Sequence, residues 1–166
     1  MFTHLKKDIN NMGKKRLPRG IRNNNPLNIR KGKWEWLGEI HSKEEKSFCV
    51  FRDMKYGYRA AFLLMFVSYY EKRGLKTIRE IINRWAPPSE NGTQLYVSFV
   101  ARRVDFDERA PLPLPYVNVD IWLALLKAMT IFECGYFEDA WGDSLRIGVL
   151  MCLPPVCANL VGKHKI

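Results

Sequence analysis

The sequence RGIRNNNPLNIR, residues 19–30, is the stretch around which the rest of the chain is organised. It contains four asparagines, a proline and three arginines among only a few apolar residues. Asparagine tolerates left-handed backbone angles and hydrogen-bonds its own main chain, and the residue before a proline is pushed to extended angles. The stretch therefore predicts an irregular, tightly hydrogen-bonded loop rather than a helix or a long strand. This loop is either plain turn chemistry or the wall of a site.

The composition is typical of one globular domain with a proper core. The 166 residues are 47% hydrophobic and 27% charged, which excludes a disordered chain. The net charge of +10 indicates an anionic partner, such as nucleic acid, a membrane surface or cell wall. We expect a basic flexible arm over residues 1–18, a single domain over residues 19–150 and a tail over residues 151–166.

No motif for a metal, a cofactor or a membrane span is present in the sequence. The four cysteines are Cys49, Cys134, Cys152 and Cys157. They have neither CxxC spacing nor histidine partners, so we expect no metal site. We expect buried, reduced thiols, with one disulfide as the alternative. Walker, GxGxxG and GxSxG patterns are missing, so we expect no cofactor. No apolar run could span a bilayer, and the amino terminus lacks a signal-peptide core. We therefore expect synthesis in the cytoplasm, with any export by another route.

The hydrophobic pattern predicts an α+β, mainly helical fold. A small β-lobe should cover about residues 28–52, with strands near Trp34–Ile40 and Ser47–Phe51 in a two- or three-stranded sheet. A helical lobe should cover about residues 56–150, beginning with an apolar helix from Tyr56.

The later helices carry clearer end signals. Thr77 and Glu80 form a capping-box pattern, and Asn118 or Asp120 could cap the most hydrophobic segment. The predicted helices are Ile78–Trp85, about Thr93–Val104, and Ile121–Phe132, and a further amphipathic segment covers Glu138–Leu150. Because Ile121–Phe132 is apolar nearly all round, we expect it at the centre of the fold.

Glu133 is the acid that the sequence singles out. It follows the most apolar predicted helix, where the negative pole of the helix dipole and apolar neighbours both disfavour a charged carboxylate. Both effects should raise its pKa, as a general acid near neutral pH requires. The alternative is a side chain that points into solvent at a frayed helix end.

Two other glutamates are weaker candidates. Glu90 precedes a predicted helix, whose dipole should stabilise its charged form, so it is a second candidate acid but better suited to a cap or an electrostatic partner. Glu39 in the β-lobe could contact a substrate or could be an exposed strand residue.

Three segments carry a family resemblance: RGIRNNNPLNIR at 19–30, FCVFRDMKYGYRA at 48–60 and INRWAPPSENGTQLYVSFV at 82–100. They resemble phage and mobile-element proteins often called structural protein P5, which look like lysozyme-like, muralytic virion proteins. NNNPLNI is similar to the segment after the catalytic glutamate of bacterial glucosaminidases. Residues 90–100 resemble the E-T-x-x-Y-V-x-x-V segment of soluble lytic transglycosylases, with two residues inserted after the acid.

The order of these motifs departs from that superfamily. In lytic transglycosylases the catalytic glutamate ends an apolar helix, is followed by serine and precedes the other motifs. Here no glutamate precedes the asparagine-rich loop, and Phe132-Glu133-Cys134-Gly135 stands in for the usual E-S-G. The resemblance therefore implies a lysozyme-like domain that is circularly rearranged, with its catalytic helix on the carboxyl-terminal side.

The resemblance also implies a substrate, the β-1,4 bond between N-acetylmuramic acid and N-acetylglucosamine in peptidoglycan. Glu133 would protonate the glycosidic oxygen, and a single-acid lytic transglycosylase fits better than a two-carboxylate muramidase. Asn25 and Asn28 would lie across a groove from Glu133 and orient sugar amides, and Tyr96 would contact the site near Glu133. Trp34 and Trp36 could stack on sugar faces. Each of these residues could instead serve the core or a turn.

Two other classes of function stay open. A virion protein of the same fold could bind cell-wall glycan without cleaving it, and the phage virion or a secretion or conjugation machinery is an implied partner. A nucleic-acid-binding module is the weaker alternative, because no recognised motif supports it and the aromatic residues do not interleave with the basic run. We expect no nucleic acid as partner.

Overall fold

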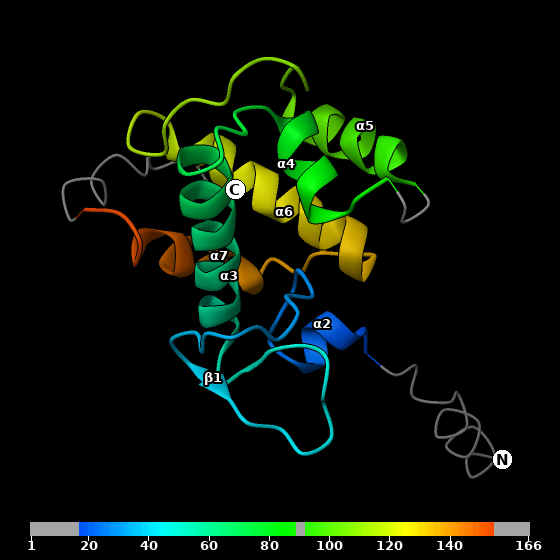
Figure 1. Ribbon diagram of the computed structural model, residues 1–166, viewed down its shortest axis with the longest axis vertical. Coiled ribbons are helices and arrows are strands. Elements are labelled where there is room, and N and C mark those ends of the chain that lie inside the picture. Colours follow the sequence, from blue (N-terminus) through cyan, green and yellow to red (C-terminus); the bar gives the residue numbers. More distant parts are fainter. Residues whose placement is uncertain (1–16, 89–91, 155–166) are drawn as a thin grey trace, which may run out of the picture.

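The computed structural model describes residues 17–88 and 92–154, and in this part of the chain the fold is mainly helical with one small sheet (Figure 1). The helices are α2 (Arg19–Arg22), α3 (Met54–Leu63), η1 (Leu64–Glu71), α4 (Ile78–Trp85), α5 (Thr93–Val104), α6 (Val119–Cys134) and α7 (Trp141–Leu150). The strands are β1 (Glu39–Ile40) and β2 (Val50–Phe51). No helix within these described ranges is both long and apolar enough to cross a membrane.

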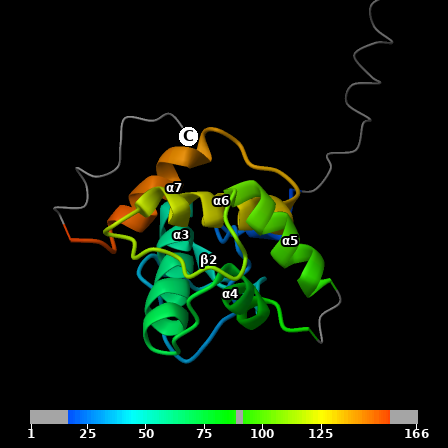
Figure 2. The same cartoon turned by 90° about the horizontal axis from the view of Figure 1, so that it is seen from above.

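Helix α6 lies at the centre, as its apolar sequence predicted. Figures 1 and 2 both place it between α5 on one side and α3 with α7 on the other. Asn118 begins it by accepting a hydrogen bond from the Ile121 N–H, and Gly135 ends it at a φ of 86°. Leu125, Leu126 and Met129 are fully buried along its length. The helix therefore delivers its last turn, with Glu133, from a rigid core.

The helix predicted from Tyr56 begins at Met54, because Asp53 caps it by accepting from the Lys55 N–H. From Leu64 it continues as a π-helix, in which each N–H bonds five residues back. The Lys72 N–H, for example, donates to the Val67 oxygen at 3.0 Å. Aromatic rings of this segment pack around Trp122 of α6, and they are Phe62, Phe66 and Tyr70.

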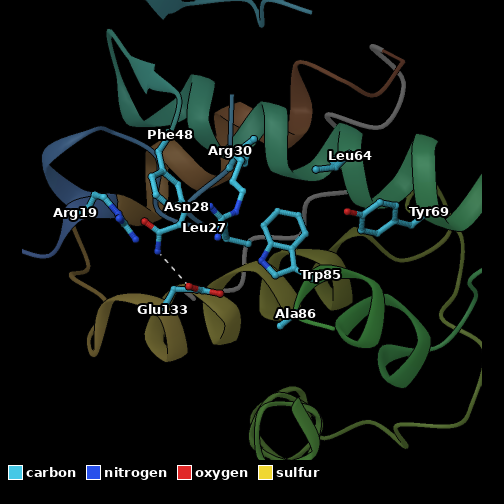
Figure 3. A pocket seen from close by; sticks show the side chains of 11 residues that line it. Arg19, Leu27, Asn28, Arg30, Phe48, Leu64, Tyr69, Trp85, Ala86 and Glu133 are labelled. Carbon is cyan, nitrogen blue, oxygen red and sulfur yellow. Dashed lines mark hydrogen bonds between the residues drawn. The ribbon is translucent and has the colours of Figure 1, made fainter. Parts of the chain in front are cut away.

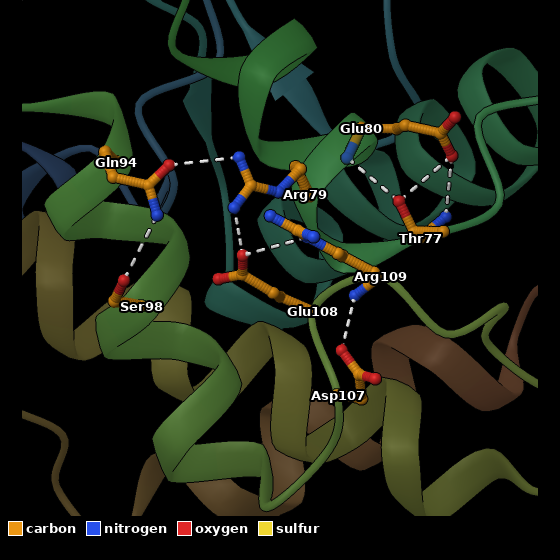
Figure 4. A network of polar contacts seen from close by, with 8 residues as sticks. All are labelled: Thr77, Arg79, Glu80, Gln94, Ser98, Asp107, Glu108 and Arg109. Carbon is orange, nitrogen blue, oxygen red and sulfur yellow. Dashed lines mark hydrogen bonds and ion pairs between the residues drawn. The ribbon is translucent and has the colours of Figure 1, made fainter.

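Helices α4 and α5 have the bounds that the sequence predicted. The capping box is formed: Thr77 accepts from the Glu80 N–H, and Glu80 reaches back to the Thr77 N–H. Arg79 then bonds Gln94 on α5 and forms an ion pair with Glu108 in the following loop (Figure 4). This network fixes α4, whose last residues reach the site.

The β-lobe is smaller than predicted. Strands β1 and β2 are antiparallel, with Glu39 opposite Phe51, and an isolated bridge joins Arg30 to Phe48. The predicted strand through Trp34 is wrong, because the chain turns after Trp36: the Glu39 N–H donates to the Trp36 oxygen, and Gly38 has a φ of 79°.

The stretch 19–30 does not begin as an irregular loop, as its sequence predicted, but with one helical turn, α2. This turn packs against the end of α6, so tertiary contact overrides the local preference. The rest of the stretch is an irregular loop with two left-handed asparagines, Asn24 and Asn28, at φ values of 50° and 53°. Helix α7 also differs, beginning at Trp141 rather than Glu138, because the Trp141 N–H closes a turn onto the Glu138 oxygen.

Candidate functional site

A pocket of about 370 Å³ lies between the 19–30 stretch and the helices (Figure 3). Five parts of the chain line it: the 19–30 stretch, the β-lobe, η1, the end of α4 and the end of α6. The lining residues are Arg19, Leu27, Asn28, Ile29, Arg30, Phe48, Leu64, Tyr69, Trp85, Ala86 and Glu133. Among these, Glu133 is the one carboxylate.

Glu133 is turned into the pocket and held by two neutral donors. The Asn28 Nδ2 donates to its Oε2 at 3.1 Å, and the Tyr96 hydroxyl donates to its Oε1 at 3.1 Å. The helix end beneath it is closed, because the Gly135 N–H donates to the Ile131 oxygen at 2.8 Å. Glu133 is half-buried and does not extend into solvent from a frayed end.

Tyr96 reaches Glu133 from α5 in a fixed orientation. Its ring stacks on Phe132, with centroids 3.8 Å apart and planes 11° from parallel. Burial raises the pKa of Tyr96 well above its ordinary value, and the negative charge of Glu133 raises it further. The phenol therefore stays neutral and keeps its proton available to Glu133.

Asn28 reaches Glu133 from the 19–30 stretch because of its left-handed backbone. Its amide nitrogen is engaged with Glu133, and its Oδ1 is buried with no hydrogen-bond partner among the described residues. The Asn28 nitrogen therefore donates to the carboxylate, and the Asn28 oxygen beside it is an acceptor that a ligand could use.

Cys134 anchors this stretch to α6. Its thiol donates to the Pro26 oxygen at 3.3 Å. Gly20 sits so close that a Cβ there would lie 3.1 Å from the Cys134 sulfur and 2.9 Å from the Asn25 oxygen. The residue after Glu133 therefore fixes the loop that carries Asn28.

The structure corrects the predicted role of Asn25. Its side chain is fully buried and bonds only its own neighbourhood. The Nδ2 donates to the oxygens of Ile29 and Cys49 at 2.9 Å, and the Oδ1 accepts from the Ile29 N–H at 2.9 Å. Asn25 cannot orient a sugar from there. It ties the loop to the β-lobe.

The predicted tryptophans do not line the pocket either. Trp34 is 84% exposed on the β-lobe, and Trp36 packs against the core. Glu39 accepts a hydrogen bond from the Trp36 N–H at 3.0 Å, so it stabilises the turn in the β-lobe. None of the three belongs to the pocket lining.

Trp85 and Tyr69 supply the aromatic wall of the pocket, and neither residue was predicted from the sequence. Trp85 ends α4 just before Ala86-Pro87-Pro88, and a tryptophan beside such a helix stop is the signal that could have marked it. Tyr69 had no comparable signal, since it depends on η1. Residues five apart, Leu64 and Tyr69, share the pocket because the π-helix brings them closer to one face than an α-helix would. Glu90, the second candidate acid, lies outside the described residues.

One comparison with known proteins gives a clear relative. The chain is 37% identical over 120 residues to Protein P5 of Pseudoalteromonas phage PM2, an alignment that covers 70% of this chain and 71% of that protein. No protein-family model matches the chain. The similarity confirms the resemblance to phage P5 proteins, and the name of the relative states no activity.

Proposed function

This chain belongs to the family of the phage protein P5, and with the geometry of its pocket as support we propose that it cleaves peptidoglycan. The bond broken is the β-1,4 linkage between N-acetylmuramic acid and N-acetylglucosamine. In this proposal the domain is lysozyme-like and circularly rearranged, and the protein acts as a component that a phage carries to the cell wall.

The observation that carries the proposal is the setting of Glu133. One carboxylate stands at the end of the central helix, faces a pocket with an aromatic wall, and receives hydrogen bonds from Asn28 and Tyr96. Aromatic side chains such as Trp85 offer flat apolar surface to a sugar ring, and a positioned carboxyl group is what glycoside cleavage requires.

The chemistry follows in two proton transfers. Protonated Glu133 gives its proton to the glycosidic oxygen as the bond from that oxygen to C1 of the muramyl sugar breaks. The carboxylate that results is stabilised by the Asn28 and Tyr96 donors. It then accepts the proton of the C6 hydroxyl of the same sugar, whose oxygen closes onto C1. The product carries a 1,6-anhydro end, no water is consumed, and Glu133 is again protonated.

A two-carboxylate hydrolase is less well supported. Such enzymes place a second acid several ångströms from the first, whereas the described lining of this pocket holds Glu133 alone as an acid. The lytic transglycosylase is therefore the preferred reaction type.

The test is loss of turbidity of purified peptidoglycan. Glu133→Gln should abolish the activity, while the matched control Glu138→Gln, on an exposed residue five positions along, should retain it. Mass spectrometry of the products should show anhydro ends rather than reducing ends. Equal activity of Glu133→Gln and wild type would remove Glu133 as the acid. Loss of activity in Glu90→Gln alone would transfer the role to Glu90 and contradict the circular rearrangement.

A second candidate is a glycan-binding protein of the same fold that does not cleave. The observation in its favour is that both Asn28 and Tyr96 donate to Glu133, and donors favour the charged carboxylate over the acid. A charged Glu133 could accept hydrogen bonds from sugar hydroxyls. Retention of the protein on peptidoglycan without any soluble product would establish this function instead.

A further inference from the structure

Two arginines on the pocket wall share one aromatic ring. The guanidinium carbon of Arg19 lies 3.7 Å from the centre of the Phe48 ring, and that of Arg30 lies 5.0 Å from it. Phe48 is buried and its backbone is bridged to Arg30, so the ring is a fixed platform. Cation–π contact of this kind orients a guanidinium while leaving its N–H groups free to donate.

No described carboxylate forms an ion pair with either arginine. Arg19 has only a weak electrostatic effect on Glu45. The pKa of Glu45 is lowered mainly by the backbone hydrogen bond from Ser47, and Arg19 is the weakest contributor. Glu45 already accepts from the N–H groups of Ser47 and Phe48. Two like charges held within 5.0 Å of one ring repel each other, and an anion between them removes that repulsion.

We propose that Arg19, Arg30 and Phe48 form a subsite for a carboxylate carried by the glycan beside the bond that Glu133 addresses. The inference rests on the proposed function. Of the two sugars in the repeating unit, the muramyl sugar carries the acid, as its lactyl carboxylate or as the carboxylates of a peptide attached there. N-acetylglucosamine carries none. The subsite therefore identifies the muramyl sugar.

The subsite also sets the direction of the strand. Figure 3 shows Arg19, Asn28 and Phe48 toward one side of the pocket and Trp85 and Tyr69 toward the other. The acidic group of the substrate is drawn to the arginines, while a neutral sugar face suits the aromatic side. One strand polarity then brings a glycosidic oxygen to Glu133.

Binding of three glycans to the full chain tests the subsite. The ligands are a neutral N-acetylglucosamine oligomer, a muramyl glycan with free lactyl carboxylates, and the same glycan with its peptides. The variant is the double substitution Arg19→Gln and Arg30→Gln. The control is Arg22→Gln with Arg52→Gln, which removes the same charge from two exposed arginines outside the pocket lining.

The double variant should lose roughly 10- to 100-fold in affinity for a carboxylate-bearing glycan and bind the neutral oligomer unchanged. The control should bind all three as wild type does. If the double variant loses affinity only for the glycan with free lactyl carboxylates, the lactyl group is the anion that the subsite binds. If it loses affinity only for the glycan that carries peptides, the peptide carboxylates are that anion. Unchanged affinity for both acidic glycans, or an equal loss for the neutral oligomer, would overturn the subsite while the wild type still bound glycan. Wild type that binds none of the three would overturn the proposed function as well.

Discussion

Tyr96 makes two separable contacts, a hydroxyl that donates to Glu133 and a ring that stacks on Phe132. Tyr96→Phe removes the first and keeps the second. If Glu133 gives up its proton in the reaction, the lost donor should lower the rate of peptidoglycan cleavage roughly 10- to 100-fold, because hydrogen bonds to charged groups are the stronger ones. Thermal unfolding should change little. The exposed Tyr116 provides the control Tyr116→Phe, and equal rates in the two variants would exclude a role for the phenol.

The cysteines offer a test of burial by pH. Burial raises the pKa of Cys134 to about 12, and the charge of Glu133 adds to the effect. Burial likewise raises the pKa of Cys49 to about 12 and that of Cys152 to about 11. The thiolate is the reactive form, so at pH 8 a thiol of pKa 12 is ionised only on the order of 10⁻⁴.

Alkylation at pH 8 should therefore leave these three cysteines unmodified in the folded protein and label them readily in urea. Peptide mapping by mass spectrometry reports each site separately. Labelling of Cys134 at the same rate with and without urea would show that its anchoring contact to Pro26 is not made in solution.

The sequence did not distinguish the roles of Asn25 and Asn28. Asn25 and Asn28 belong to one stretch and have the same chemistry, so the sequence predicts the same role for both. Their orientation is decided by backbone angles and by the β-lobe, which fixes the Asn25 amide from both sides. The pairing of Asn28 with Glu133 was expected only from family resemblance, because no local pattern relates residues so far apart.

Between elements, Gly57 lets α3 approach the asparagine-rich stretch. A Cβ at Gly57 would overlap the Asn24 oxygen, which is backbone and cannot swing away. Gly57→Ala should therefore lower the free energy of unfolding by about 1–3 kcal/mol and reduce cleavage, because the stretch that carries Asn28 must shift. Gly142→Ala is the matched control: its Cβ meets nothing within 4 Å, so helix propensity should stabilise α7 by about 0.5 kcal/mol.

Urea unfolding and turbidity assays on the two variants measure these effects. A gain in stability at both sites would mean that α3 and the loop are not in contact in solution.

The sequence predicted the elements whose ends are marked locally. Helices α4 and α5 have the predicted bounds, and α4 has a capping box whose residues are adjacent in the chain. Elements that depend on tertiary contact were missed. The turn α2 forms against α6, and the change from α3 to η1 has no residue signature comparable to a cap. Tyr69 of the aromatic wall was missed for the same reason, because its place in the pocket depends on η1.

For the whole molecule, the net charge of +10 predicts long-range attraction to an anionic wall. Retention on sedimented peptidoglycan should fall steeply between about 0.05 M and about 1 M NaCl, because the screening length shrinks to about 3 Å at the upper end. Added salt should weaken binding to intact wall more than it weakens binding to a soluble neutral glycan. Retention that is insensitive to salt would show that contacts in the pocket, rather than net charge, hold the protein on the wall.

The mainly helical class with a small sheet was predicted from hydrophobic periodicity, and the structure has it. Periodicity fixes which faces are buried but not the order in which motifs meet in space. The lysozyme-like arrangement therefore remains a proposal that rests on Glu133 and its neighbours.

The contact between Asn28 and Glu133 joins residues 105 positions apart in the chain. Ribosomes add about 5–20 residues per second, so roughly 5–20 seconds separate the appearance of the first partner from that of the second. During that interval the nascent polypeptide holds one wall of the pocket and lacks the other. The host cell that makes the protein is consequently exposed to a complete pocket only after residue 133 has been added, and a fragment released before that point carries no assembled site.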